Sequence, residues 1–374
     1  MKVDWLIVGA GFTGATLAER IASVLGQKVF LVERRDHIGG NAYDEYNEHG
    51  ILVHCYGPHI FHTNSKTVWD YLSRFTRWRP YQHRVLGIVE GKKIPIPFNL
   101  NSLYAIFPPR HAERLEEKLV GQYGLGAKVP ILRLRENEDK DIRFLAEYVY
   151  QNIFYGYSLK QWGLRPEELD PSVTERVPVY ISRDDRYFQD IYQAIPGEGY
   201  TAMFRQMLRN PNIKILLNTH YREILDAVRF NRMIYTGPID AFFDYMHGPL
   251  PYRSLRFEFV TLHQEWFQEV GTVNYPNEYD FTRITEQKHL SGQQLPVTTL
   301  VYEYPEAYRP GENDPYYPVL REENREVYAR YLEEAKKLKG TVIFAGRLAD
   351  YNYYNMDQAV ERALRLFEEE IACG

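Results

Sequence analysis

The hydrophobic pattern predicts α/β elements at both ends of the chain. Residues 1–35 follow the order strand, helix, strand, and the second strand lies at Lys28–Glu33. Further α/β elements are expected later in the chain: a helix at 201–208, strands at 213–217 and 342–346, a charged amphipathic helix at 322–338 and a closing helix at 356–371. Pieces of one α/β domain are therefore spread over the whole sequence.

The middle of the chain has a different pattern. Ser65 or Asn64 is expected to cap a short helix, and residues 84–89 and 92–96 flank Glu90-Gly91 as a hairpin. Pro95 and Pro97 confine the second arm of that hairpin to a sheet edge or end it. The remaining expectations are helices within 101–163 (notably 111–123 and 142–154), irregular polar chain at 170–192, and short strands at 233–235, 256–260, 271–275 and 297–302.

The first strand runs directly into a GxGxxG motif, Gly9-Ala10-Gly11-Phe12-Thr13-Gly14. Gly9 permits a tight turn, Gly11 allows backbone to approach a pyrophosphate, and Gly14 lets the helix pack close to the sheet. The helix N-terminus adds N–H groups and a positive dipole end. The motif predicts a dinucleotide site, although alone it could be a glycine turn of an ordinary α/β domain.

An acidic residue supports this interpretation. Glu33 lies 24 residues after Gly9, about where a carboxylate should accept the ribose hydroxyls. Arg34 could indicate NADP, but a carboxylate at the strand tip would repel a 2′-phosphate. The loop then reaches Gly39-Gly40-Asn41, and a basic residue before a glycine doublet resembles FAD proteins of the amine-oxidase and GDP-dissociation-inhibitor type.

A second glycine-bearing strand near the C-terminus also favours FAD over NAD. It reads Phe344-Ala345-Gly346-Arg347, and Met356-Asp357 opens the last helix. The predicted fold class is α/β, with a discontinuous Rossmann-like FAD-binding domain, a helical insert and an antiparallel β-sheet domain. The expected bounds are 1–80, 193–235 and 335–374 for the FAD-binding domain, 100–165 for the helical domain, and 81–99, 166–192 and 236–334 for the sheet and substrate domain.

Composition narrows the partners. The 374 residues carry a net charge of −5 and no basic stretch, so nucleic acid is not expected and an anionic ligand must be held by a few local arginines. Two cysteines are too few for a disulfide framework, which fits a cytoplasmic protein, and no apolar run predicts membrane insertion. The 31 tyrosines offer flat faces with polar tips that suit sugars and bases.

Several motifs, in order along the chain, resemble signatures of bacterial UDP-galactopyranose mutases. They are residues 56–63 (YGPHIFHT), 155–163 (YGYSLKQWG), 176–178 (RVP), 184–188 (DDRYF), 279–286 (YDFTRITE), 313–318 (NDPYYP) and 346–357 (GRL, then Tyr353 and Met356-Asp357). Ser158 departs from the expected threonine but keeps a hydroxyl. Residues 180–183 also differ from other members of the family.

The resemblance implies an isomerase that interconverts UDP-galactopyranose and UDP-galactofuranose without net redox change. FAD must be reduced, because oxidised flavin N5 is electron-poor. Reduced N5 would attack the anomeric carbon, UDP would leave, and the sugar would open through an iminium and reclose through another hydroxyl. The resemblance also implies a homodimer that supplies galactofuranose for cell-surface glycans, and no metal.

The resemblance assigns two arginines to the diphosphate. Arg176 and Arg283 match the family's essential pair, and a guanidinium meets phosphate oxygens bidentately. The segment from Trp162 to Tyr187, which holds Arg176, is expected to act as a mobile lid that closes over the diphosphate.

Aromatic residues are implied for the nucleotide and the sugar. Either Tyr316 or Tyr317 should face inward, and the sequence leaves that choice open. The implied substrate-binding residues are Tyr157, Trp162, Tyr187, Asn274, Tyr316, Tyr317 and Tyr353.

His59 matches a histidine near flavin N5, where it could steady the reduced flavin or relay a proton, with His62 as competitor. Arg347 would meet the isoalloxazine, and Asp357 the ribityl or pyrophosphate side. The implied cofactor-binding residues are Gly9, Gly11, Phe12, Thr13, Gly14, Glu33, Arg34, Gly39, Gly40, Asn41, His59, Gly346, Arg347, Met356 and Asp357.

Two other functions remain possible on the same scaffold. One is an FAD-dependent oxidoreductase resembling amine oxidases, which needs no paired arginines over a diphosphate. The other is a non-catalytic binding protein resembling the GDP-dissociation inhibitors, which need not hold flavin. The sequence does not identify the donor that reduces the flavin or the tolerance for other UDP-sugars.

Overall fold

The chain divides into two compact units in the computed structural model, which describes residues 1–175 and 177–372. Unit 1 comprises Met1–Tyr81, Asp190–Tyr252 and the chain from Glu323 onwards. Unit 2 comprises Gln82–Gln189 and Arg253–Glu322, which hold the predicted helical domain and most of the predicted sheet domain. Residues 236–252 and 323–334, expected in the sheet domain, belong to unit 1.

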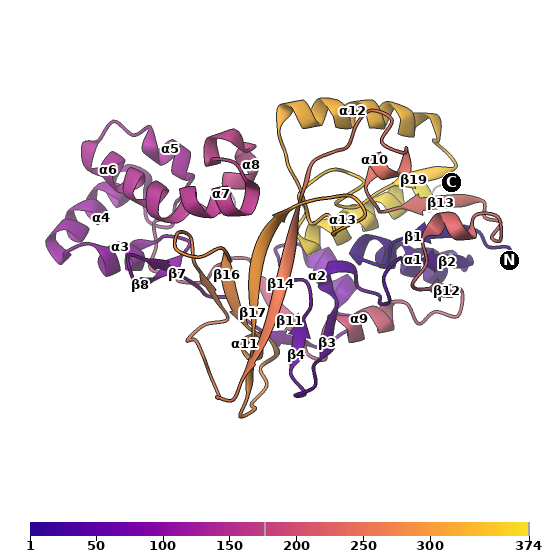
Figure 1. The fold of residues 1–374 in the computed structure, drawn as a ribbon, viewed down its shortest axis with the longest axis horizontal. Coiled ribbons are helices and arrows are strands. Elements are labelled where there is room, and N and C mark those ends of the chain that lie inside the picture. The colour runs from indigo at the N-terminus through magenta and orange to yellow at the C-terminus, as the bar shows by residue number, and fades with distance from the viewer. Residues whose placement is uncertain (176, 373–374) are drawn as a thin grey trace. The chain divides into compact units, whose positions relative to one another are not determined.

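The core of unit 1 is a five-stranded parallel sheet with strand order β12-β2-β1-β13-β19 (Figure 1). The strands are β1 (Trp5–Val8), β2 (Val29–Val32), β12 (Ile213–Leu216), β13 (Arg232–Tyr235) and β19 (Val342–Phe344). β1 and β2 are almost wholly buried, as expected for central parallel strands covered on both faces. The order matches the 3-2-1-4-5 sequence of a Rossmann sheet and confirms the predicted fold class.

Helices and two small sheets complete unit 1. The helices are α1 (Phe12–Val24), α2 (Lys66–Leu72), α9 (Tyr200–Met207), α10 (Ile239–Phe242), α12 (Glu322–Lys337) and α13 (Met356–Leu366). The small sheets pair β3 (Asp44–Tyr46) with β4 (Leu52–His54), and β11 (Tyr192–Pro196) with both β5 (Phe61–Thr63) and β6 (Trp78–Pro80). Ser65, not Asn64, caps α2, because its Oγ accepts the Val68 N–H at 3.4 Å.

Unit 2 contains a seven-stranded sheet with order β18-β14-β17-β16-β15-β7-β8. Its strands are β7 (Val85–Val89), β8 (Lys92–Ile96), β14 (Tyr252–Leu262), β15 (Thr272–Asn274), β16 (Arg283–Glu286), β17 (Thr298–Ala307) and β18 (Tyr317–Pro318). The predicted hairpin is confirmed as β7–β8, with left-handed Glu90 and Gly91 at the turn and β8 at the edge of the sheet.

Two details of this sheet differ from expectation. β15 and β7 run parallel, so the sheet is mixed and not wholly antiparallel. This pair is possible because a long stretch of chain separates the two strands, as a parallel crossover requires. β16, which carries Arg283, was not predicted as a strand, since Arg283-Ile284-Thr285-Glu286 is too short to show a clear alternation.

The helical part of unit 2 packs on the β7–β8 hairpin through one apolar core that includes Ile94, Leu115 and Leu145. Its helices are α3 (Leu100–Ile106), α4 (Pro109–Tyr123), α5 (Ile131–Arg135), α6 (Lys140–Val149), α7 (Gly156–Trp162), α8 (Pro171–Thr174) and α11 (Gln287–Ser291). A π-helix (Tyr150–Tyr155) joins α6 to α7, and β9 (Lys128–Val129) pairs with β10 (Val179–Tyr180). The stretch 170–192 thus contains short regular elements where irregular chain was expected.

Candidate active site

The glycine motif forms the turn between β1 and α1. Gly9 has φ +101°, and a Cβ there would lie 2.1 Å from Thr236 Oγ1. A Cβ on Gly14 would lie 1.9 Å from the Gly9 carbonyl oxygen, so α1 packs against the turn as the motif predicts. Both positions require glycine because of the protein's own packing.

Gly11 differs from its two partners. A Cβ there would meet no protein atom nearer than Gly40 Cα at 3.8 Å, and its φ of −78° suits any residue. Folding therefore does not explain glycine at this position. Gly11 precedes the first turn of α1, whose N–H groups can bind an anion, so the position leaves room for the close approach of a phosphate group.

The glycine doublet lies against the same turn. Gly39 has φ +97° and donates its N–H to the Ala10 carbonyl at 2.9 Å, and a Cβ on Gly40 would lie 3.0 Å from Gly11 Cα. The β2 loop thus packs closely on the glycine motif. Asn41 Oδ1 accepts a hydrogen bond of 3.0 Å from Arg35, whose guanidinium lies 4.4 Å from the centre of the Tyr56 ring.

Glu33 is buried at the tip of β2. One carboxylate oxygen accepts the Ala10 N–H at 2.9 Å and the other accepts the Arg35 N–H at 3.0 Å. A carboxylate has about four lone pairs, so ribose hydroxyls can still bind it. Glu33 therefore also shapes the glycine turn, while Arg34 beside it is exposed.

The C-terminal glycine strand reaches the start of α1. Gly346 follows β19 with φ +102°, and a Cβ there would lie 3.0 Å from Thr13 Oγ1. Arg347 comes next and is half-buried, and Asp350 Oδ2 accepts the Gly346 N–H at 3.1 Å. The two glycine-bearing strands are therefore brought together as predicted.

Asp357 lies in the first turn of α13, after Met356 and the capping residue Asn355. Its Oδ1 is buried and has no hydrogen-bond partner among the described residues. A buried carboxylate oxygen is costly unless it is paired. Asp357 therefore fits a role in holding a polar ligand such as the hydroxyls of a dinucleotide.

His59 and His62 have different surroundings. His62 on β5 has its Nδ1 2.9 Å from Oδ2 of Asp190, which lies just before β11, so its ring is paired with a carboxylate. His59 Nδ1 lies 2.9 Å from the Gly57 carbonyl, an acceptor only, so Nδ1 carries the proton. The His59 ring lies 6.4 Å from the Tyr200 ring, and Phe12 at the start of α1 contacts that ring from another side.

His54 supports the backbone of His59. Its Nδ1 accepts the His59 N–H at 3.1 Å, so this nitrogen is unprotonated. Burial lowers the pKa of His54 to about 4, and the charge of Arg79 acts in the same direction. His54 is neutral at physiological pH and keeps the loop in place as an acceptor.

In unit 2, Arg283 is bound by a carboxylate that the sequence did not single out. Its Nε and Nη2 donate to the two oxygens of Glu303 at 2.9 and 2.7 Å, from neighbouring strands β16 and β17. The Glu303 side chain is 2 % exposed and that of Arg283 is 24 % exposed. Burial alone would lower the pKa of Arg283, but Glu303 outweighs it and holds this pKa well above its usual value.

Two predicted tyrosines lie near this arginine. The hydroxyls of Tyr157 and Tyr317 both act electrostatically on the Arg283 guanidinium. Tyr317 is half-buried and its ring lies 5.9 Å from Trp162, whereas Tyr316 is 4 % exposed and packs edge-on against Phe257. Of the two adjacent tyrosines, Tyr317 is therefore the one that shares a site with Arg283.

Helix α7, which carries Tyr157 and Trp162, is held in place by backbone contacts. A Cβ on Gly156 would lie 2.6 Å from the Pro276 carbonyl, so the helix starts in close contact with the β15–β16 turn. Lys160 Nζ donates to the Tyr275 carbonyl at 2.7 Å, and Arg253 Nε donates to the Gln161 carbonyl at 2.8 Å. These contacts join α7 to the strands that present Arg283 and Tyr317.

Asn274 ends β15 directly beside Arg283 in the register of the sheet. Its Oδ1 is buried and finds no hydrogen-bond partner in the part of the chain that the structure describes, which fits the predicted contact with a nucleotide. The backbone of Tyr316 is fixed by its N–H bond to the Arg253 carbonyl at 2.9 Å. The sequence missed Glu303, Lys160 and Arg253, since single charged residues on strands and helices are usually solvated.

Tyr187 and Tyr353 are placed by other segments. Tyr187 donates its N–H to the His83 carbonyl at 2.7 Å, and its ring contacts the rings of His83 and Phe188. Tyr353 belongs to unit 1 and is half-buried in the segment that leads into α13. Arg176, the predicted partner of Arg283, lies outside the described residues.

The described residues also bear on metal binding and on membrane insertion. Within residues 1–175 and 177–372, no group of His, Cys, Asp and Glu side chains could hold a metal ion. Among the helices of the same residues, none is long and apolar enough to span a bilayer.

Comparison with known proteins finds the same family by its profile and among similar sequences. The profile of the UDP-galactopyranose mutase family matches residues 152–353, and that of an NAD(P)-binding Rossmann-like domain matches residues 7–75. A Klebsiella pneumoniae protein named probable UDP-galactopyranose mutase is 37 % identical over 370 residues, which cover 97 % of this chain and 94 % of the relative.

Two further proteins extend the comparison. An Escherichia coli protein named dTDP-fucopyranose mutase is 34 % identical over 366 residues, which cover 96 % of both chains. The crystal structure of a reduced UDP-galactopyranose mutase superimposes with a TM-score of 0.76 at 16 % identity, covering 100 % of this chain and 96 % of the other. At that identity the structural match shows the fold.

Proposed function

The chain belongs to the UDP-galactopyranose mutase family, and we propose that it interconverts UDP-galactopyranose and UDP-galactofuranose with reduced FAD as cofactor. The reaction is an isomerisation that contracts or expands the sugar ring, with no net oxidation or reduction. The observation that carries this proposal is the bidentate Arg283–Glu303 pair with Tyr157 and Tyr317 beside it.

The pair suits the binding of a diphosphate. Glu303 engages Nε and Nη2 of Arg283, which leaves the remaining N–H groups of the guanidinium able to donate to phosphate oxygens. A half-buried guanidinium held in one orientation is also preorganised for charge that grows as UDP leaves. Arg176 is the second cation of this proposal, and together they would stabilise the departing diphosphate.

The aromatic residues of unit 2 suit the rest of a nucleotide sugar. Tyr157 and Trp162 lie on α7, which Lys160 and Arg253 fix, and Tyr317 lies 5.9 Å from Trp162, measured between rings. Aromatic faces can stack on uracil and on a sugar ring, and their polar tips can donate hydrogen bonds. Tyr187, Tyr353 and Asn274 complete the proposed substrate-binding set.

The residues of unit 1 fit FAD. The turn at Gly11 and the N-terminus of α1 would bind the pyrophosphate, Glu33 the ribose, and Asp357 the ribityl or pyrophosphate side. A reduced flavin would supply a nucleophilic nitrogen for the anomeric carbon of the sugar. Gly346 and the Gly39–Gly40 loop would enclose the cofactor near the glycine turn.

His59 and Arg347 are the proposed charge-stabilising residues of unit 1. His59 keeps Nδ1 protonated toward Gly57, so in the neutral imidazole Nε2 is the nitrogen that can accept or relay a proton. Arg347 follows Gly346 directly and would place a positive charge toward the reduced cofactor.

The family membership weighs against the other functions considered. Neither the amine-oxidase-like enzyme nor the non-catalytic binding protein requires the paired Arg283 of unit 2. A dTDP-sugar is the remaining alternative, because the Escherichia coli relative named dTDP-fucopyranose mutase is 34 % identical, close to the 37 % of the Klebsiella protein.

The test is a chromatographic assay of the purified protein with dithionite. UDP-galactofuranose and dTDP-fucofuranose are incubated in parallel, and the nucleotide sugars are separated after a fixed time. The proposal expects conversion of the UDP-sugar to its pyranose form. Conversion of the dTDP-sugar alone would reassign the substrate, and oxygen consumption with either sugar would indicate an oxidase.

A further inference from the structure

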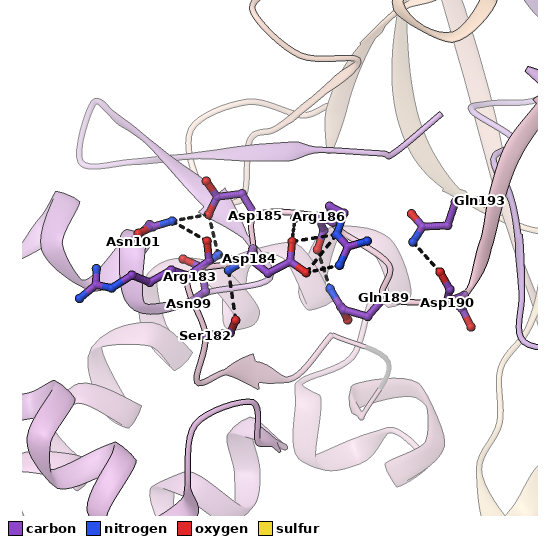
Figure 2. A network of polar contacts seen from close by, with 10 residues as sticks. All are labelled: Asn99, Asn101, Ser182, Arg183, Asp184, Asp185, Arg186, Gln189, Asp190 and Gln193. Carbon is purple, nitrogen blue, oxygen red and sulfur yellow. Dashed lines mark hydrogen bonds and ion pairs between the residues drawn. The ribbon is translucent and has the colours of Figure 1, made fainter. Parts of the chain in front are cut away.

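A polar cluster fixes residues 182–186, which directly precede Tyr187 (Figure 2). Asp185 Oδ1 accepts one hydrogen bond of 2.9 Å from Asn99 Nδ2 and another of 2.9 Å from Asn101 Nδ2. The same two amides also donate to the backbone carbonyls of Asp184 and Arg183 at 3.2 and 3.0 Å. We call Asp185, Asn99 and Asn101 the carboxamide clamp.

The Asn99 side chain makes hydrogen bonds to two separate parts of the chain. Its Oδ1 caps α3 by accepting the Ser102 N–H at 3.0 Å, and its Nδ2 holds the Asp184–Asp185 turn. The side chain is 2 % exposed, so neither group can exchange these partners freely for water. The position of the turn is thereby fixed to the start of α3.

Backbone contacts on both sides extend this anchoring. Leu100 donates its N–H to the Ser182 carbonyl at 3.0 Å, and Tyr180 donates to the Phe98 carbonyl at 2.8 Å. Asp184 and Arg186 close the turn internally, since Arg186 Nη2 lies 2.7 Å from Asp184 Oδ2, and this contact lowers the pKa of Asp184. Two residues after Asp185, the Tyr187 N–H bonds to the His83 carbonyl at 2.7 Å.

We infer that Asp185 is a positioning residue for substrate, acting through Tyr187. The inference rests on the proposed function, in which Tyr187 and Arg176 contact the nucleotide sugar. The clamp anchors the chain two residues before Tyr187 and so sets where Tyr187 starts.

The clamp depends on one acceptor facing two donors, and this makes it testable. In Asp185→Ala the acceptor is lost and the turn is free to shift. In Asp185→Asn the amide oxygen can still accept from both carboxamides, so most of the function should remain. In Asn101→Asp a donor becomes a carboxylate beside Asp185, and the two like charges repel.

The double variant Asn101→Asp/Asp185→Asn re-forms the pair with donor and acceptor exchanged. The new amide nitrogen at position 185 would donate to the new carboxylate at position 101, while the amide oxygen at position 185 would still accept from Asn99. If the two positions act through their contact, the double variant should bind better than Asn101→Asp alone. If the two positions act independently, the losses of binding in the two single variants would instead add in the double variant.

The experiment measures the Kd for UDP by calorimetry and, with UDP-galactofuranose and dithionite, KM and kcat. Asp185→Ala and Asn101→Asp should each raise Kd and KM about tenfold with a smaller change in kcat, since they misplace a binding group. Flavin content should stay at the wild-type level, because the clamp lies in unit 2. Arg183→Ala is the matched control, as its exposed ion pair with Glu116 anchors the same segment.

The outcomes distinguish the positioning role of Asp185 from the proposed mutase function. Kd and KM within twofold of wild type in Asp185→Ala, or no rescue by the double variant, would overturn the positioning role while wild-type turnover still supported the mutase. A lower Tm with unchanged Kd would show that the clamp only stabilises the fold. Wild-type protein that neither converts the sugar nor binds UDP would contradict the proposed function, and the clamp's role with it.

Discussion

Arg283 and Glu303 face each other across β16 and β17 as register partners, and their side chains form a bidentate ion pair of 2.7 and 2.9 Å. A carboxylate that is 2 % exposed holds a guanidinium that is only partly exposed. This arrangement fixes the direction of the guanidinium before any ligand arrives. It also couples the proposed substrate site to the stability of the sheet.

The coupling predicts two separable effects of Arg283→Ala. Loss of the cation leaves the buried Glu303 carboxylate uncompensated, which should destabilise the protein by about 3 kcal/mol. Turnover should fall at least about a hundredfold, because a charge-assisted contact to the leaving diphosphate is lost. Flavin absorbance should be retained. Arg283→Ala/Glu303→Gln should recover stability without activity, whereas recovered turnover would show that Arg283 does not act on substrate.

The glycine turn predicts a contrast between two neighbouring substitutions. Gly14→Ala would place a methyl group 1.9 Å from the Gly9 carbonyl oxygen, so this variant should misfold or lose most of its stability. Gly11→Ala meets no protein atom nearer than 3.8 Å and should fold with a near wild-type Tm but bind flavin weakly. Thermal unfolding and flavin absorbance measure both. Full flavin content in a folded Gly11→Ala protein would place the pyrophosphate elsewhere.

The two histidines of residues 59–62 should behave differently. His62→Asn removes the ion pair with Asp190, which should cost about 1 kcal/mol of stability and leave flavin chemistry unchanged. His59→Asn should instead shift the reduction potential of the bound flavin and lower kcat. Potentiometry of both variants tests this. A shifted potential in His62→Asn with none in His59→Asn would exchange their roles.

His54 predicts a specific pH dependence of stability. Its pKa is lowered from 6.5 to about 4, so the unfolded chain binds a proton that the folded chain excludes between those values. The contribution of His54 to the free energy of unfolding is at its full value above about pH 6.5. It declines as the pH falls toward 4, by at most about 1.4 kcal/mol per pH unit.

The matched variant for this prediction is His54→Asn, whose Oδ1 can accept the His59 N–H without titrating. Urea unfolding at pH 7 and pH 5 gives the free energy of unfolding for both proteins. The wild type should lose more stability than the variant on acidification. Equal losses would mean that His54 is protonated in the folded state as easily as in the unfolded state.

The glycine spacing and the apolar periodicity were sufficient to predict the parallel sheet and the glycine turn of unit 1. Gly9, Gly14 and Gly346 are constrained by contacts that any Rossmann-type turn makes, so their roles follow from local sequence. The hairpin at Glu90-Gly91 likewise follows from its turn residues. The Gly14 contact and the hairpin turn depend on near neighbours in the chain, and the positive φ of Gly9 and Gly346 is a local demand that glycine meets.

The substrate half depends on contacts between distant residues and was predicted only in part. Glu303 is paired with Arg283 through strand register, and the parallel β15–β7 pair joins strands that are far apart in sequence. Neither of these pairings leaves a periodic signal in the sequence. The choice between Tyr316 and Tyr317 also depended on a distant contact, since Phe257 packs against Tyr316, which directly precedes β18.

We propose that turnover requires a reduced flavin and that the protein supplies the charges that hold UDP. One sample of flavin-loaded protein is incubated with UDP-galactofuranose. The flavin starts oxidised, is reduced with dithionite and is then reoxidised by air. The pyranose and furanose forms of the sugar are quantified at each stage. The account predicts conversion only in the reduced stage. Equal conversion in the oxidised stages, or by flavin-free protein, would contradict it.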